Sequence, residues 1–183
     1  MKKANIYLAD GFEEIEALTV VDVLRRAGVD AATVSITNVK EVRGAHDIIV
    51  IADKTYGEAD NRDADMMILP GGMPGTANLE KHEDLKALIK EFYHNEKYIA
   101  AICAAPSILG KMELLESSMA TCYPGFEKEL KGAILSDDLV IRHKNIITSQ
   151  GPGTAMLFAL DLAEILVGKE KVEMLKDQMI IQG

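Results

Sequence analysis

Short apolar runs alternate with longer amphipathic segments along nearly the whole chain, and this alternation limits the folds that it can adopt. Strands are expected at residues 4–9, 31–36, 48–51, 66–69, 98–102, 119–122, 139–141 and 146–148. Helices are expected at residues 12–27, 84–95, 154–167 and 169–179, and from Pro106 onward. The run at 48–51 can form a hairpin with residues near Val42. Strands alternating with helices predict an α/β fold with a mostly parallel sheet and helices on both faces.

The length and composition fit one soluble domain. The chain has 183 residues, of which 48% are hydrophobic and 27% charged, and no repeat or linker divides it. We therefore expect a single domain over residues 1–183. The formal net charge of -9 repels phosphate backbones and anionic lipid, which argues against nucleic acid and membrane partners.

Cysteine content and hydropathy bear on the compartment. Only 2 cysteines are present, so a disulfide framework is not expected. The start of the sequence lacks the long apolar region of a signal peptide, and no run approaches the about 18 apolar residues of a membrane span. These features predict a cytoplasmic protein, in which thiols stay reduced.

The loops that directly follow strands are the best candidates for function, because open α/β sheets bind ligands beyond the carboxyl ends of their strands. Three such loops contain notable residues, at 10–16, 69–75 and 103–106. Cys103 lies between a predicted strand and a helix that opens at Pro106, among small neighbours. The amides and dipole of that helix favour a thiolate, the reactive form of cysteine. A buried and inert cysteine explains the local pattern equally well.

The other two loops are less specific. Gly71 and Gly72 allow a tight turn whose amides could stabilise an oxyanion, but an ordinary turn has the same sequence. Asp10 and Glu13 have the spacing of a capping box, so helix capping explains these acidic residues. Glu16 falls on the border of the predicted apolar helix face, and periodicity does not single it out.

No metal or cofactor site is expected from residue spacing. The histidines are His46, His82, His94 and His143, and none has metal-ligand spacing with a cysteine or with another histidine. The sequence of residues 151–154 resembles a phosphate loop but lacks its Gly-Lys-Ser/Thr ending, so it is interpreted as a helix start.

Four motifs together resemble the ThiJ/PfpI superfamily, in particular its DJ-one branch of small stress-response proteins. They are GFEEIE at 11–16, LPGG at 69–72, AAICAAP at 100–106 and TSQGPGT at 148–154. Each motif is unspecific alone, but their order and spacing make a strong match over nearly the whole chain.

The resemblance implies a flavodoxin-like three-layer α/β/α sandwich, a homodimer and a site without a cofactor. It implies that Cys103 is the nucleophile and that a protonated Glu16 donates a hydrogen bond to its thiolate, which lowers the pKa of the thiol. It also implies that the amides of Gly72 and Ala104 stabilise an oxyanion.

Two positions depart from patterns in the superfamily. PfpI-type peptidases have a histidine directly after the cysteine, where this chain has Ala104, which argues against proteolysis. Many DJ-one relatives have the sequence Thr-His-Pro further along the chain. The matching stretch of this chain is Thr-Cys-Tyr-Pro at 121–124, in which Tyr123 takes the place of the histidine. Because successive residues of a strand face opposite sides, only one of Cys122 and Tyr123 can face Cys103. The resemblance implies that Tyr123 lines the Cys103 pocket and that Cys122 points away from it.

The resemblance favours a deglycase or glyoxalase that acts on methylglyoxal or early glycation adducts through a Cys103 hemithioacetal. A redox sensor or chaperone-like protein that uses oxidation of Cys103 is an alternative. An amidase-like hydrolase and a binding module without chemistry are two further alternatives.

Overall fold

A seven-stranded sheet runs through the centre of the computed structural model, which describes residues 1–181. In spatial order its strands are β10 (Val140–His143), β11 (Ile146–Ser149), β7 (Tyr98–Ile102), β6 (Met66–Leu69), β1 (Lys3–Leu8), β2 (Asp30–Ser35) and β5 (Lys54–Thr55). All neighbours pair in parallel except β10, which is antiparallel to β11 at one edge.

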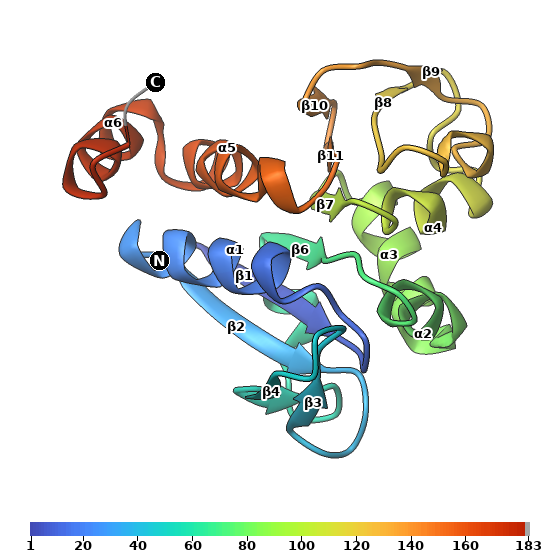
Figure 1. Ribbon diagram of the computed structural model, residues 1–183, viewed down its shortest axis with the longest axis horizontal. Coiled ribbons are helices and arrows are strands. Elements are labelled where there is room, and N and C mark those ends of the chain that lie inside the picture. Colours follow the sequence, from blue (N-terminus) through green and yellow to red (C-terminus); the bar gives the residue numbers. More distant parts are fainter. Residues whose placement is uncertain (182–183) are drawn as a thin grey trace.

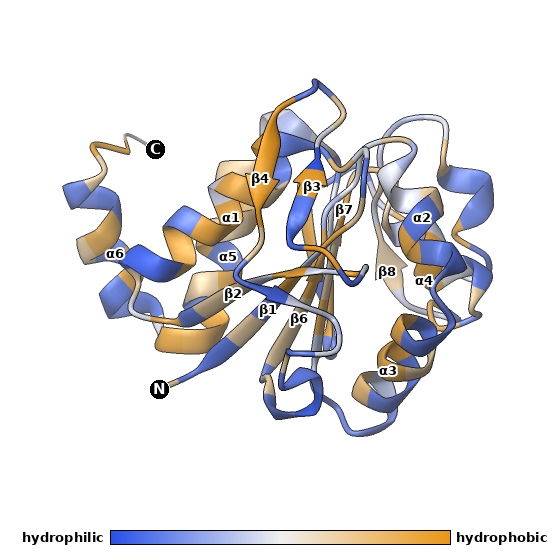
Figure 2. Cartoon of the chain, turned by 90° about the horizontal axis from the view of Figure 1, so that it is seen from below, coloured by the Kyte–Doolittle hydropathy of each residue, from blue (hydrophilic) through white to orange (hydrophobic). Residues whose placement is uncertain are grey.

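The middle strands carry apolar residues on both faces because helices cover both faces. Every residue of β6 is buried, as are the last four residues of β7. One face is covered by α1 (Glu14–Arg26), α5 (Ala155–Val167) and α6 (Lys169–Gln178), and the other by α2 (Gly75–Lys81), α3 (Glu83–His94) and α4 (Pro106–Lys111). The two layers lie on opposite sides of the sheet in Figure 1 and Figure 2. Each has its own apolar core, and the three-layer α/β/α prediction is confirmed.

The order of the five longest parallel strands shows where a ligand should bind. Taken in chain order as strands one to five, β1, β2, β6, β7 and β11 are arranged 2-1-3-4-5, the flavodoxin-like order. The order reverses between β1 and β6. Ligands of such sheets bind at the carboxyl ends of the strands beside this switch point.

Two small sheets lie outside the central one. The predicted hairpin is confirmed, with β3 (Glu41–Arg43) antiparallel to β4 (Ile49–Ile51). The strand expected at 119–122 was too long, because only β8 (Met119–Ala120) pairs, and its partner is β9 (Ile134–Leu135). The pattern did not reveal β5, β9 or α2, which are too short to show a clear periodicity.

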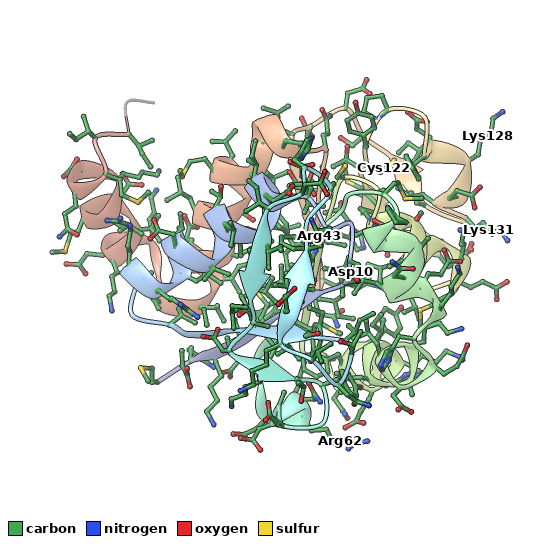
Figure 3. The ribbon with its side chains drawn as sticks, turned by 60° about the horizontal axis from the view of Figure 1, so that its bottom comes forward. Asp10, Arg43, Arg62, Cys122, Lys128 and Lys131 are labelled. Atoms are coloured by element: carbon green, nitrogen blue, oxygen red, sulfur yellow. The ribbon has the colours of Figure 1, made fainter. Side chains whose placement is uncertain are left out.

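Three helix starts differ from the expectation, and one of them is that of α3, which begins at Glu83 rather than residue 84. Helix α1 begins at Glu14 rather than residue 12, and α5 begins after a 3-10 turn at Pro152–Thr154. The predicted capping box is wrong: the residue that caps α1 is Glu13, which makes no side-chain cap hydrogen bond. The Asp10 carboxylate instead accepts a hydrogen bond from the amide of Arg43, 2.9 Å away, and the two residues lie close together in Figure 3.

Among residues 1–181, no helix combines the length and the apolar character that crossing a bilayer requires. Residues 182–183 of the expected domain lie outside the described part of the chain.

Candidate active site

The loops after β1, β6 and β7, which the sequence made candidates for function, meet beside the switch point. Gly71 lies between the other two loops: a Cβ atom at this position would be 2.6 Å from the Cβ of Cys103 and 2.8 Å from Oε2 of Glu16. Only glycine leaves room for this approach. Three segments that are far apart in sequence therefore form one site.

Cys103 occupies a sharp turn between β7 and α4. Its φ of 64° lies in the left-handed region, which a residue with a side chain rarely adopts, and such strain is common where a nucleophile is presented. The Cys103 amide donates a hydrogen bond to the carbonyl of Ser149, 2.9 Å away, which ties the turn to β11. The side chain is half-buried, so the sulfur is both constrained and reachable.

Glu16 is fully buried, although its sequence position placed it only on the border of the apolar helix face. Its Oε2 accepts a hydrogen bond from the amide of Gly71, 2.7 Å away. Its Oε1 has no hydrogen-bond partner among the residues that the structure describes. Burial raises the pKa of Glu16 to about 7, against the smaller lowering effects of the Gly71 amide and the Cys103 thiol.

The Cys103 side chain and the Glu16 carboxyl group both lie against Gly71, and each group shifts the pKa of the other. Burial raises the pKa of the Cys103 thiol, and an ionised Glu16 raises it further, whereas the amides of Gly72 and Ala104 lower it. Protonation of Glu16 removes its repulsion of the thiolate and supplies a donor. The site can therefore hold one negative charge and one proton between the two groups.

Tyr123 and Cys122 lie in a loop rather than in the predicted strand. The amide of Tyr123 donates to the carbonyl of Cys103, 2.8 Å away, and its ring lies against Gly151. The Tyr123 side chain is partly solvent-exposed, and its role toward a substrate stays a prediction. Cys122 is buried in the core on the α2–α4 side, whereas Cys103 packs against the core on the other face. In Figure 3, Cys122 lies on the same side of the molecule as Lys128.

Comparison with protein families decides the identity of this fold and site. A model of the DJ-1/PfpI family matches residues 2–165, which include all four motifs. The chain belongs to the DJ-1/PfpI family.

Similar proteins agree with membership of the DJ-1/PfpI family. The glutathione-independent glyoxalase DJ-1 of Schizosaccharomyces pombe is 33% identical, over 93% of this chain and 94% of that protein. The solved structure of oxidized Toxoplasma gondii DJ-1 is 34% identical with a TM-score of 0.93, over 98% of both chains. Protein DJ-1 homolog B of Arabidopsis thaliana is 39% identical over 93% of this chain, which spans only 39% of that relative's length. These similarities confirm the resemblance to the DJ-one branch and the flavodoxin-like fold.

A second group of polar residues, outside the nucleophile motif of the DJ-1/PfpI family, lies beside this site. The carboxylate of Glu14 accepts hydrogen bonds from the amide of His46 at 2.8 Å and from its Nδ1 at 2.9 Å. The amide of Glu13 donates to the carbonyl of Gly71, 2.9 Å away, which connects this group to the Cys103 turn. The sequence does not reveal this group, because His46 lies 32 positions from Glu14. The two residues come together only because the β3–β4 hairpin returns to α1.

The segment that resembled a phosphate loop has a structural role. The hydroxyl of Thr154 donates to the carbonyl of Gly151 at 2.8 Å and accepts from its amide at 3.1 Å. These bonds close the turn that leads into α5. The interpretation of residues 151–154 as a helix start is therefore confirmed.

Proposed function

We propose that this protein is a cysteine-dependent enzyme of the deglycase or glyoxalase type, acting on methylglyoxal or early glycation adducts. The observation that carries the proposal is the half-buried Cys103 on a strained turn, beside a buried carboxyl group whose pKa is raised to about 7. A carboxyl group with a pKa near neutrality is suited to both giving and taking a proton at physiological pH. The glyoxalase from Schizosaccharomyces pombe supports this reaction class for a relative.

The proposed reaction needs no external oxidant or cofactor. The Cys103 thiolate adds to the aldehyde carbon of methylglyoxal and, after protonation of the oxygen, gives a hemithioacetal. Glu16 removes the proton from that carbon and returns a proton to the neighbouring carbon, which converts the hemithioacetal into a lactoyl thioester. Water then cleaves the thioester, so the sum is methylglyoxal plus water giving lactate, with the thiol regenerated.

The amides of Gly72 and Ala104 are proposed to stabilise the negative charge that develops on oxygen. Both already interact with the thiol of Cys103 and lower its pKa. A carbonyl carbon bonded to the sulfur would bring its oxygen close to the same donors. Tyr123 is proposed as a hydrogen-bond donor to the second carbonyl group, since a phenol is not a base near pH 7.

A time course with methylglyoxal tests the proposal. Lactate production should proceed with the wild type and with Cys122→Ala, and should be abolished in Cys103→Ala. Cys122 is the matched control because it is the only other cysteine and lies in the core on the opposite face of the sheet. Equal lactate production by wild type and Cys103→Ala would refute the proposed nucleophile.

Oxidation of Cys103 is the second candidate function. The amides of Gly72 and Ala104 and a protonated Glu16 could hold the oxygens of a sulfinate, which two molecules of hydrogen peroxide form from a thiolate with release of two molecules of water. The oxidised state of the Toxoplasma gondii relative supports this alternative. A gain of chaperone activity that depends on peroxide and on Cys103, without methylglyoxal turnover, would favour it.

We further infer that the chain forms a homodimer in the cytoplasm. Helix α1 and strand β4 expose Ile15, Leu18, Ile49 and Ile51, with 37–65% of each residue accessible. Figure 2 shows β4 as an apolar strand on the outside of the molecule. An apolar face of this kind is typical of an interaction surface.

A further inference from the structure

Glu13, Glu14 and His46 form a group of potential metal ligands at the start of α1. One carboxylate oxygen from each glutamate and a ring nitrogen of His46 all lie within 4.8 Å of one another. The Nδ1 of His46 lies 2.9 Å from Oε2 of Glu14 and 3.6 Å from Oε2 of Glu13. Both carboxylates therefore converge on the same ring nitrogen.

The two carboxylates differ in the number of hydrogen bonds that they accept from the protein. Glu14 accepts from the amide and from the ring of His46, and these bonds outweigh its burial and lower its pKa, so it is ionised. Glu13 is only 8% exposed, yet its carboxylate accepts no hydrogen bond within residues 1–181. The ion pair with His46 is therefore the one charged contact that the described residues give to this mostly buried carboxylate. The Glu13 atom that faces the His46 ring is Oε2.

The spacing of the three ligand atoms matches a small coordination sphere. Zinc binds imidazole nitrogen and carboxylate oxygen at about 2.0–2.1 Å, which places neighbouring ligands of a tetrahedron about 3.3–3.4 Å apart. The observed separations of 2.9 Å and 3.6 Å lie on either side of this value. An imidazole ligand favours zinc and related transition metals over magnesium and calcium, which prefer oxygen.

We propose that Glu13, Glu14 and His46 bind a divalent transition metal ion, with Zn²⁺ as the best fit, and leave a fourth position open. The ion replaces the contacts of His46 Nδ1 with both carboxylates and binds all three side chains instead. The side chain of His46 is 67% exposed, so an ion can reach the site from solvent. The amide of His46 still anchors Glu14 through its second oxygen, Oε1, which keeps the hairpin in place.

The proposed metal ligands do not include the residues of the proposed Cys103 chemistry, but the two sites are coupled through charge. Glu13 contributes to the raised pKa of Glu16 through its charge. A cation bound at Glu13 would oppose that effect. Metal binding itself uses neither Cys103 nor Glu16, and the proposal can therefore be tested in Cys103→Ala.

Calorimetric titration with Zn²⁺ at pH 7.5 tests the proposal, with Co²⁺ absorption as a second measurement. Cys103→Ala should bind one ion per chain, and its Co²⁺ complex should lack a thiolate charge-transfer band. Glu13→Gln and His46→Ala, made in the same background, should each weaken binding at least tenfold. His94→Ala is the matched control, since His94 is exposed on α3 and bonds only to its own helix. Its affinity should be unchanged.

Two results would overturn the proposal. The first is Zn²⁺ binding by the wild type that disappears in Cys103→Ala, which would place the ion on the thiol. The second is an affinity that His46→Ala and Glu13→Gln leave unchanged. Thermal unfolding of each variant checks that it folds, and because the two substitutions lie on different elements, a folding defect in one still leaves the other as a test.

Discussion

At the scale of single residues, the pair of Cys103 and Glu16 is expected to govern thiol reactivity. Cys122 is buried, and burial followed by the charge of Glu127 raises its pKa to about 11 with no amide to oppose them. Burial and an ionised Glu16 raise the pKa of Cys103 to about 12, but protonation of Glu16 removes that charge. Cys103 is also the more accessible of the two thiols, so iodoacetamide at pH 7 should label it first. Glu16→Gln keeps a hydrogen-bond donor but cannot take the thiol proton, so the loss of this general base should slow the labelling by about tenfold or more. Intact-protein mass spectrometry measures both rates, and first labelling of Cys122 would contradict the assignment.

The buried Glu16 should also make stability depend on pH once the thiol is removed. In Cys103→Ala the folded protein favours protonated Glu16, whose pKa of about 7 lies above its ordinary value of 4.5. The protonated Glu16 therefore adds to the free energy of unfolding at low pH, and this stabilisation is complete below pH 4.5. It is lost as pH rises through 7, by up to about 3 kcal/mol. Urea unfolding between pH 4.5 and 8 measures this slope. The slope should be absent in Cys103→Ala combined with Glu16→Gln, and an equal slope in both would show that other groups cause it.

At the scale of elements, the close approach of the β1, β6 and β7 loops depends on the missing side chain of Gly71. Gly71→Ala would place a methyl group 2.6 Å from the Cβ of Cys103 and 3.0 Å from the carbonyl of Ile102. Such overpacking costs about 1–3 kcal/mol. We expect this loss in urea unfolding, together with slower labelling of Cys103 because the loops move apart. Gly57→Ala is the control, since nothing lies within 4 Å of its added atom, and equal behaviour of the two variants would rule out the steric explanation.

At the scale of the whole molecule, the exposed apolar face of α1 and β4 predicts a dimer. Ile51 is 65% exposed, so Ile51→Lys should leave the monomer folded and convert the protein from dimer to monomer at micromolar concentration. Light scattering coupled to size exclusion gives the mass. Ile134→Lys, at a similarly exposed position on β9, should remain dimeric. A monomeric wild type would contradict the prediction.

The central sheet and the position of Cys103 directly after a strand were predictable because they depend on local signals. The runs at 66–69 and 98–102 form strands with the predicted bounds, and the alternation with helices implies parallel pairing. Parallel pairing in turn brings the loops that follow strands to one edge, which made Cys103 a candidate before its contacts were known. Short elements such as α2 and β5 were missed because two to seven residues show too little periodicity.

Only the tertiary structure decided the environment of each functional residue. Periodicity left Glu16 on the border of a helix face, and its burial and raised pKa arise because the Gly71 loop, 55 positions away, covers it. The position of His46 next to Glu14 likewise depends on how the β3–β4 hairpin packs on α1. The sequence by itself determined which residue types follow each strand, since secondary structure depends on near neighbours. Distances, burial and shared protons depend on segments that only the folded chain brings into contact.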